Sequence, residues 1–488
     1  MGILLVFSLL TACHPQDPVP VQAPLDTVTK ARDTIPLKTS LQIAIEALAA
    51  DPAMKNGSFG LLVTDAATGE VIAEHNPDLS LVPASTMKLF TTAAALEILG
   101  PDKRFRTSLL YEGRITDSVL NGNIVIRGGG DPTLGVGDET RKVLYSNWVR
   151  QIRKAGIDSV HGNVIGDGTI FDKDYIPYTW TWGEINLAYC AAASGLSVNG
   201  NTFTLYLDAR KRERFHPGLE KVTPYIPDLW FENRTYETED ADMEDLYLVG
   251  HPFSDARMIR GVVPQGKEEA ALVATVSNPP LVLAADFRNA LETKGIQVSG
   301  RALSLADSDS LQKLLERARY TELSVVSSPT VASIVYTVNR NSYNFFAETL
   351  LKHIGLKIMR YGSTDAGARA VYNLLRDKGM DTDGFFMFDG SGISRFNSVT
   401  ARQMVWVLDY MTRSPYAEEY RNSLSVAGVS GTLARLLNGT PAEGNLKAKS
   451  GSMSRVKSYA GYIRTPSGRQ LIFAVIVNNF NCTGHEMT

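Results

Sequence analysis

The segment that most constrains this chain runs from Pro83 to Leu96, where an apolar helix begins with a serine and a lysine three positions apart. Ala and Leu favour a helix, and the run ends at Leu99-Gly100-Pro101, because a Gly closes a helix and a Pro cannot continue it. Pro83 places the helix start at or near Ser85. The Ser85 hydroxyl then lies beside unpaired backbone N–H groups and the positive end of the helix dipole, where a developing oxyanion is favoured.

Lys88 lies one turn further along the same face, so its amine is within reach of the Ser85 oxygen. A serine is a poor nucleophile unless a base takes its proton, and a lysine is a base only when neutral. Burial and a second nearby cation would both lower the lysine pKa. The spacing alone is weak, since Ser85 could simply cap the helix and the chain has two further copies, at Ser310–Lys313 and Ser454–Lys457. Only the first copy follows an apolar strand-like run and opens an apolar helix.

Composition excludes some classes of function. The chain has 488 residues, enough for two or three domains with sizeable cores. Lys and Arg number 49 against 52 Asp and Glu, giving a net charge of −3, so no basic excess predicts a nucleic-acid partner. The seven His show no His-Glu-x-x-His or similar spacing, so we predict no metal and no other cofactor.

The N-terminus predicts export. Residues 1–12 form an apolar run too short to span a bilayer but suited to a signal peptide. Leu10-Thr11-Ala12-Cys13 resembles a bacterial lipobox, in which Cys13 would be lipidated, although no Lys or Arg precedes the apolar run. Cleavage by an ordinary signal peptidase is the alternative. Residues 13–38 are Pro-rich with little apolar periodicity and are interpreted as a tether.

Hydrophobic periodicity divides the remaining chain into flanking and central parts. We expect a helix at 39–50 and a hairpin at 59–73 first, then helices at 331–338, 345–354, 364–378 and 399–412, and a last hairpin at 459–477. In between, short strand-like runs alternate with turn signals such as Asn121-Gly122 and Asn199-Gly200, and 281–294 is the clearest helix. The pattern predicts a discontinuous α/β domain, 39–106 and 320–488, and a β-rich insertion of one or two subdomains at 107–319.

Two further motifs lie in the flanking part. Ser342-Tyr343-Asn344 falls in a break between two helices, where a loop can project both polar side chains into a cleft. Lys449-Ser450-Gly451 precedes the last hairpin, and we expect it on an edge strand, where Gly would let a substrate backbone approach closely. A second Ser-x-Asn, at Ser197–Asn199, runs into an Asn-Gly turn and is interpreted as a hairpin.

Ser-x-x-Lys, Ser-x-Asn and Lys-Ser/Thr-Gly in this order are typical of penicillin-recognising serine enzymes. From about residue 40 to 480 the chain resembles the class C low-molecular-mass penicillin-binding proteins, the D-alanyl-D-alanine carboxypeptidase/endopeptidases of the penicillin-binding protein 4 type (peptidase family S13). Three features depart from that family: Tyr343 where Asp is frequent, Ser450 where Thr is commoner, and an end at Thr488 where the family continues into a C-terminal helix. The segments that carry the resemblance are Pro83–Thr86, Gly130–Leu134, Trp180–Trp182, Leu196–Asn201, Asp389–Arg395 and Val426–Leu433.

The resemblance implies a β-lactamase/transpeptidase-like fold, with an antiparallel sheet flanked by helices, and acyl transfer as the chemistry. Ser85 would attack the substrate carbonyl while Lys88 takes its proton, and Ser342 with Lys449 would carry a proton to the leaving amine. Asn344 would hold the peptide backbone. Peptidoglycan stem peptides and cross-links would be the substrates, and β-lactam antibiotics would be covalent inhibitors.

The resemblance also implies how the substrate is held. The backbone N–H groups of Ser85 and Ser452 would form an oxyanion hole, while Lys449 and Ser450, beside Gly451, would receive the terminal carboxylate. Glu184, just after Trp180–Trp182, matches an acidic residue that meets the free amino group of the stem-peptide diaminoacid. A solvated surface glutamate is the alternative for Glu184.

Two other functions stay open from the sequence. A β-lactamase would need a device for rapid deacylation, and we find no Glu-x-x-x-Asn element and no Tyr-x-Asn second motif. A catalytically idle lipoprotein that binds peptidoglycan is the other alternative. The lipobox-like segment predicts a protein in the periplasm of a Gram-negative bacterium, held at the membrane through a lipid anchor on Cys13.

Overall fold

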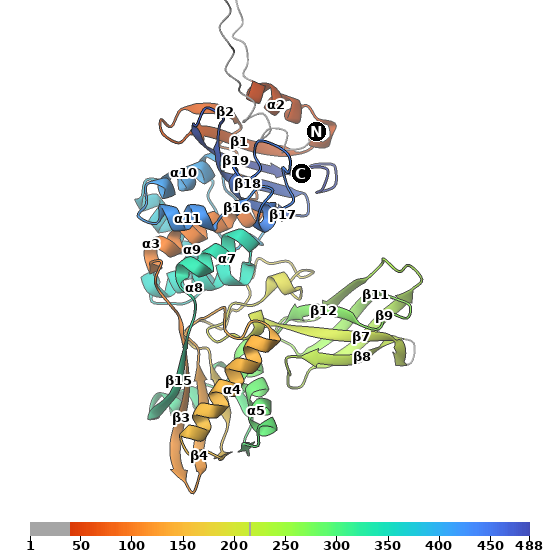
Figure 1. The fold of residues 1–488 in the computed structure, drawn as a ribbon, viewed down its shortest axis with the longest axis vertical. Coiled ribbons are helices and arrows are strands. Elements are labelled where there is room, and N and C mark those ends of the chain that lie inside the picture. The colour runs from red at the N-terminus through yellow and green to blue at the C-terminus, as the bar shows by residue number, and fades with distance from the viewer. Residues whose placement is uncertain (1–39, 214–215) are drawn as a thin grey trace, which may run out of the picture.

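The computed structural model describes residues 40–213 and 216–488. The predicted signal peptide 1–12, Cys13 and the tether 13–38 lie outside these residues. The two flanking parts of the chain come together at one end of an elongated molecule, and the central part forms the other end and a lateral arm (Figure 1). No helix of the described segments combines the length and the apolar character that crossing a bilayer requires.

A six-stranded antiparallel sheet joins the two ends of the chain, in the order β16-β17-β18-β19-β1-β2. Along β19, alternate residues belong to two hydrophobic cores, because successive side chains point to opposite faces of the sheet. Both faces are therefore covered, which explains why the last strand is a continuous apolar run. The strands are β1 (Ser58–Asp65), β2 (Val71–His75), β16 (Ser425–Val426), β17 (Lys447–Met453), β18 (Val456–Arg464) and β19 (Gln470–Asn478).

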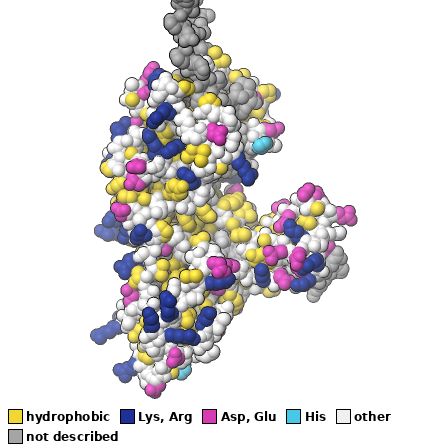
Figure 2. Space-filling view, viewed as in Figure 1, with side chains coloured by type: hydrophobic (Ala, Val, Ile, Leu, Met, Phe, Trp, Pro, Cys, Tyr) yellow, Lys and Arg dark blue, Asp and Glu magenta, His cyan; other side chains and the backbone are white. Residues whose placement is uncertain are grey.

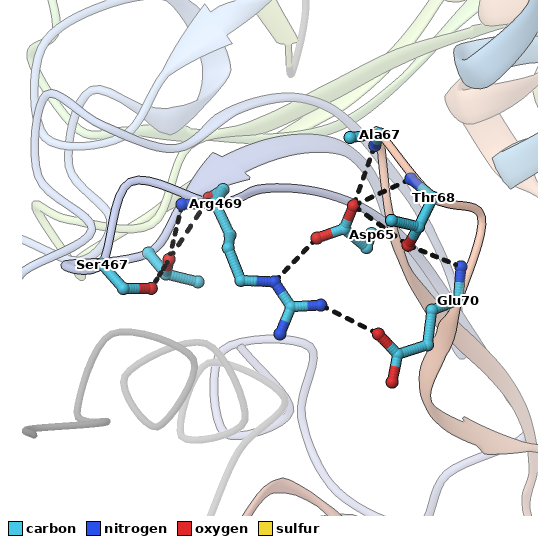
Figure 3. Close-up of polar contacts among 7 residues, drawn as sticks. Asp65, Ala67, Thr68, Glu70, Ser467 and Arg469 are labelled. Atoms are coloured by element: carbon cyan, nitrogen blue, oxygen red, sulfur yellow. Dashed lines mark hydrogen bonds and ion pairs between the residues drawn. The ribbon is translucent and has the colours of Figure 1, made fainter.

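Arg469 ties the turn between β1 and β2 to the turn between β18 and β19 (Figure 3). Its guanidinium donates to Asp65 at 2.8 Å and to Glu70 at 3.1 Å. The bond from Arg469, followed by the backbone N–H groups of Ala67 and Thr68, lowers the pKa of Asp65 to about 2. The first and last hairpins of the chain, both predicted from periodicity, are thus joined at their tips as well as along β1 and β19.

Helices cover both faces of this sheet. Helix α2 covers one face, and α3, buried on almost every side, lies at the centre of the cluster on the other. Helix α8 continues past the predicted end at Gly355. This Gly does not end the helix but allows close packing on α9, since an added Cβ would lie 2.7 Å from the Gly367 nitrogen. The helices are α2 (Ser40–Ala49), α3 (Lys88–Leu99), α7 (Val331–Asn341), α8 (Asn344–Met359), α9 (Thr364–Asp377), α10 (Ala401–Thr412) and α11 (Ala417–Ser423).

The central part of the chain contains a seven-stranded sheet packed against α4 (Asp138–Lys154) and α5 (Pro279–Thr293), with α6 (Asp309–Glu316) nearby. Helix α4 was missed in the sequence, although Leu144, Trp148 and Ile152 recur at its buried face. The last strand pairs with β3, so the segment 320–327, expected in the flanking domain, belongs to this sheet. The strands are β3 (Arg106–Thr116), β4 (Val119–Arg127), β5 (Ser159–His161), β6 (Val164–Asp167), β13 (Gln297–Val298), β14 (Ala302–Ser304) and β15 (Tyr320–Ser327).

Two three-stranded sheets, β12-β7-β8 and β10-β11-β9, form the lateral arm around their own apolar core (Figure 1). The central part is thus β-rich, as predicted. The arm strands are β7 (Thr202–Glu213), β8 (His216–Thr223), β9 (Trp230–Thr238), β10 (Asp245–Val249), β11 (Ala256–Pro264) and β12 (Ala270–Thr275).

Of the two Asn-Gly turn predictions in the central part, one is wrong, and the other gives a turn but not the predicted hairpin. Asn121-Gly122 lies inside β4, where Gly122 faces Gly113 at a close approach of two backbones, and the chain turns instead at Asp117-Ser118. Asn199-Gly200 forms a short 3₁₀ turn before β7. The partners of β7 are β8 and β12, so no hairpin forms at Ser197–Asn199.

Candidate active site

Ser85 lies in a 3₁₀ turn, Ala84–Met87, that runs directly into α3, as the sequence predicted. The residue before it, Ala84, has a φ of 49°, which is the left-handed region that an alanine rarely adopts. Such a conformation costs about 1–3 kcal/mol and survives only where surrounding structure imposes it. Here Gly392 packs directly on the Ala84 carbonyl, at a position where an added Cβ would collide with that oxygen.

Lys88 is fully buried, and its amine has three polar neighbours. Nζ lies 2.8 Å from Ser85 Oγ, 2.6 Å from Asn344 Oδ1 and 2.6 Å from the Ser391 carbonyl oxygen. A neutral amine has two N–H groups, which these two carbonyl-type oxygens accept, and one lone pair, which then faces the Ser85 hydroxyl. Burial lowers the pKa of Lys88 to about 7, against the opposing charges of Asp389 and Glu348. The neutral base that the sequence hypothesis required is therefore well populated near neutral pH.

Ser342 and Asn344 stand at the junction of α7 and α8. Ser342 closes α7 in the left-handed conformation, with a φ of 60°, and Asn344 opens α8. This abrupt junction turns both side chains toward Ser85. Asn344 links Lys88 to the central part of the chain. Its Oδ1 accepts from Lys88, and its Nδ2 donates to the Tyr189 carbonyl at 2.8 Å.

Lys449 lies on β17 and is also fully buried. Its Nζ donates to Ser342 Oγ at 2.9 Å and to the Ser450 carbonyl at 2.6 Å. Burial, and secondly the charge of Lys88, hold the pKa of Lys449 well below its usual value. Each motif serine thus has its own buried lysine amine.

A cleft of about 530 Å³ lies over Ser85 and along β17, lined by Ser342, Ser450 and Ser452 among others. β16 pairs only with the first two residues of β17, so within the described residues the Lys449–Met453 part has no neighbouring strand on that edge. Gly451 brings β17 against Ser85, since an added Cβ would lie 3.0 Å from the Ser85 nitrogen and 2.6 Å from the Pro83 carbonyl. A bound peptide could pair with this edge while its carbonyl lies beside Ser85.

Two buried carboxylates support the site and were given no role in the sequence. Glu348 accepts from the Gly390 and Ser391 backbone N–H groups at 3.1 and 2.7 Å. Burial, and secondly Asp389, raise the pKa of Glu348 to about 7. Glu348 lies four residues after Asn344, which puts the two on one helix face; that spacing was the available signal.

Asp389 is fully buried and shapes the loop that follows it. It accepts from the backbone N–H groups of Gly392 and Ser394, from the Asn397 side chain and from Trp180 Nε1, all within 2.6–2.8 Å. Asp389 and Glu348 together fix the loop whose Ser391 carbonyl accepts from Lys88. The sequence had marked Asp389–Arg395 only as a segment of resemblance.

Glu184 lies on the central part of the chain and is about one-quarter exposed. One carboxylate oxygen accepts from the Thr181 hydroxyl, and the other lies 3.7 Å from the Arg395 guanidinium. Burial, and secondly the Glu184 charge, raise the pKa of Tyr189, whose backbone carbonyl binds Asn344. Glu184 therefore neighbours the site but has a cationic partner of its own. Within the described residues no cluster of His, Cys, Asp and Glu could hold a metal ion.

The fold and the three motifs define the class: a serine enzyme of the penicillin-recognising type. The chain belongs to the D-Ala-D-Ala carboxypeptidase 3 (S13) family, whose family model matches residues 41–487. The predicted family, fold class and enzyme class, a serine-type D-Ala-D-Ala carboxypeptidase, are thereby confirmed.

Individual relatives agree. A D-alanyl-D-alanine carboxypeptidase of Actinomadura sp. is 32% identical over 459 residues, which cover 90% of this chain and 81% of that protein. The D-alanyl-D-alanine carboxypeptidase DacB of Haemophilus influenzae is 26% identical over 430 residues, covering 88% and 86%. The crystal structure of penicillin binding protein 4 (dacB) from Haemophilus influenzae shares the fold, with a TM-score of 0.77 and 24% identity over 89% of this chain and 93% of that one.

Proposed function

We propose that this chain cleaves the terminal D-Ala-D-Ala bond of peptidoglycan stem peptides, and the D-alanyl bond of peptide cross-links, through an acyl-enzyme on Ser85. The observation that carries the proposal is the position of the Lys88 amine, 2.8 Å from Ser85 Oγ in a fully buried site that favours its neutral form. A helix cap with a solvated lysine, the alternative for this motif, would show neither feature.

In the acylation step, the Ser85 oxygen attacks the carbonyl carbon of the penultimate D-alanine while its proton passes to the Lys88 lone pair. The carbonyl oxygen becomes an oxyanion, which the backbone N–H groups of Ser85 and Ser452 would stabilise. The close approach of Gly451 to the Ser85 nitrogen supports this placement. Asn344 would bind the peptide backbone of the donor strand.

The tetrahedral intermediate collapses when the C–N bond breaks and the leaving nitrogen takes a proton. Ser342, whose Oγ lies 2.9 Å from the Lys449 amine, would deliver that proton. The carboxylate of the leaving residue would lie against the Ser450 hydroxyl, which is 2.7 Å from Thr432 Oγ1, and near the Lys449 amine. Ser342 would regain a proton from the Lys88 ammonium, which leaves Lys88 neutral again. Water then attacks the ester carbonyl, Lys88 takes the water proton and passes it to the Ser85 oxygen as the ester C–O bond breaks, and Ser85 is released.

Three further assignments concern the diaminoacid, the inhibitors and the domain limits. Glu184 would receive the free amino group of the diaminoacid, exchanging its 3.7 Å contact with Arg395 for the ligand. β-Lactams would acylate Ser85; a Haemophilus influenzae relative of the same fold has been crystallised with a β-lactam. We also propose that residues 40–106 and 328–488 form the catalytic domain and that 107–327 form the insertion.

For location, we propose a periplasmic protein of a Gram-negative bacterium anchored through a lipid on Cys13. The lipobox-like segment supports this, and several acyl chains would give firm retention. Replacing Cys13 by Ser should move the protein from the membrane fraction to the soluble fraction. Unchanged fractionation of the Cys13→Ser protein would contradict the anchor.

The test of the activity is release of D-alanine from a stem pentapeptide, followed by mass spectrometry, with Ser85→Ala as the control. The same enzyme should also split a cross-linked muropeptide dimer and should hydrolyse a fluorescent penicillin only slowly after one rapid turnover. Rapid penicillin turnover without D-alanine release would favour a β-lactamase. Absence of all three reactions would favour an idle peptidoglycan-binding protein.

A further inference from the structure

A second cavity, of about 440 Å³, lies apart from the catalytic cleft. Its walls come from four segments: residues 172–185 and 251–253 of the central part, residues 363–365 at the start of α9, and Phe388, the residue before Asp389. A cavity of this size is in the range of small-molecule sites, about 300–1,000 Å³. None of the motif residues lines it, and the mechanism above does not use it.

Exposed aromatic rings surround this cavity. Tyr178 is 79% exposed, Trp182 58% and Phe253 51%, although rings of this size are normally largely buried. His251 continues the same surface, with its ring centre 6.4 Å from that of Trp182 and 5.6 Å from that of Phe253. Figure 2 shows hydrophobic side chains gathered where the lateral arm joins the rest of the molecule. Several exposed rings around one concavity indicate a binding site rather than scattered surface residues.

Polar groups are placed within the same cavity. Thr364 is only 8% exposed, yet its Oγ1 has no hydrogen-bond partner among the described residues, and it lines the cavity. A buried hydroxyl without a partner costs free energy, which a bound ligand would recover. Asp174 and Asp365 add exposed carboxylates to the lining.

The lining carries three carboxylates, and one of them already has a cationic partner. Asp172, the most buried carboxylate of the lining, is already paired with Lys352 at 2.7 Å, and the Lys352 amine is fully buried there. A ligand with hydroxyl groups fits this lining, because its O–H groups can donate to Asp174 and Asp365 and its apolar ring face can stack on the aromatic rings.

We propose that this cavity binds a neutral sugar of the N-acetylhexosamine type, from the glycan strand that carries the stem peptide. The inference rests on the proposed function for the identity of the substrate polymer. Trp180 connects the two sites, because its ring lines the cavity while its Nε1 donates to Asp389 at 2.8 Å. Asp389 in turn shapes the loop that binds Lys88, so the sugar site adjoins the wall of the catalytic centre.

The first experiment compares two substrates: a stem pentapeptide, and the same pentapeptide attached to its N-acetylglucosaminyl-N-acetylmuramic acid disaccharide. The disaccharide should lower KM for D-alanine release by about ten-fold, the effect of one well-placed aromatic anchor. Phe253→Ala should remove this advantage while leaving kcat and KM for the free pentapeptide unchanged. Tyr236→Ala, a 65% exposed ring on the arm outside the cavity, is the matched control and should keep the advantage.

The second experiment needs no catalysis. An N-acetylglucosamine tetramer, titrated against the wild-type protein, should change the fluorescence of the exposed Trp182, and Thr364→Val should weaken the binding several-fold. Equal KM values for the two substrates, with no response to the tetramer, would overturn the sugar site. Failure to release D-alanine from both substrates, with tetramer binding intact, would overturn the proposed activity and not the cavity. Binding of tetramethylammonium but not of the tetramer would show that the cavity is a cation site and would also overturn the proposal.

Discussion

The acylation rate should depend on pH through the single proton on Lys88. Burial lowers the Lys88 pKa from 10.5 to about 7, and only the neutral amine can accept the Ser85 proton. The rate should therefore rise as pH increases through 7 and level off above it. With this pKa about half of the amine is neutral at pH 7, whereas an unshifted lysine would be neutral in about one molecule in 3,000.

The assay is stopped-flow acylation by a fluorescent penicillin from pH 5 to 9. Because the neutral fraction at pH 5 is about one in a hundred, the rate should fall about fifty-fold between pH 7 and pH 5. Glu348, with its pKa raised to about 7, is negatively charged mainly above pH 7 and there raises the Lys88 pKa, so in Glu348→Gln the upper part of the rise should move slightly to lower pH. A thermal melt of the variant controls for the loss of an acceptor for the Gly390 and Ser391 N–H groups.

A rate that does not change from pH 5 to 9 would contradict the lowered Lys88 pKa as the control of acylation, and so would a rise centred near pH 10. Either result would mean that the Lys88 amine is not the group whose protonation limits acylation. If the rise moves to higher pH in Glu348→Gln, the Glu348 charge does not raise the Lys88 pKa, although Lys88 could still be the base.

Three other changes test separate parts of the site. Lys88→Met keeps the length and burial of the side chain but has no amine, so acylation should fall by at least about a thousand-fold with the fold retained; near-normal acylation would exclude Lys88 as the base. Gly451→Ala places a Cβ 2.6 Å from the Pro83 carbonyl and should slow acylation by about a hundred-fold, as loss of an oxyanion donor does; Gly183→Ala, where nothing lies within 4 Å, is the control. Glu184→Gln should slow cleavage of muropeptides with a free side-chain amine by about 10- to 150-fold, the loss of one charge-assisted hydrogen bond, and leave benzylpenicillin acylation unchanged; equal loss on both would indicate a folding defect.

Short-range patterns in the sequence predicted much of the catalytic centre. The Ser85–Lys88 spacing, the helix break at Ser342 and the terminal hairpin all depend on local rules of helix capping, helix periodicity and strand alternation. The structure brings these segments together around one cleft, with Lys88 and Lys449 each bound to a motif serine. The family was predicted from the order of the three motifs and from the segments around them.

Features that depend on tertiary contacts were not predictable in the same way. The left-handed Ala84 is imposed by the packing of Gly392, which is distant in sequence. Gly355 was predicted to end a helix. Glycine is needed there because α9 packs closely against it, and this contact cannot be seen in the sequence. Glu348 was given no role in the sequence, and only its bonds to the loop after Asp389 explain its burial.

The most direct test of the account is the site of penicillin attachment. Intact-protein mass spectrometry after incubation with benzylpenicillin should show one covalent adduct, and peptide mapping should place it on Ser85. The Ser85→Ala protein, folded by the same thermal criterion, should take up no adduct. An adduct that survives in Ser85→Ala, or that maps to Ser310 or Ser454 of the other two Ser-x-x-Lys copies, would contradict the assignment of the nucleophile.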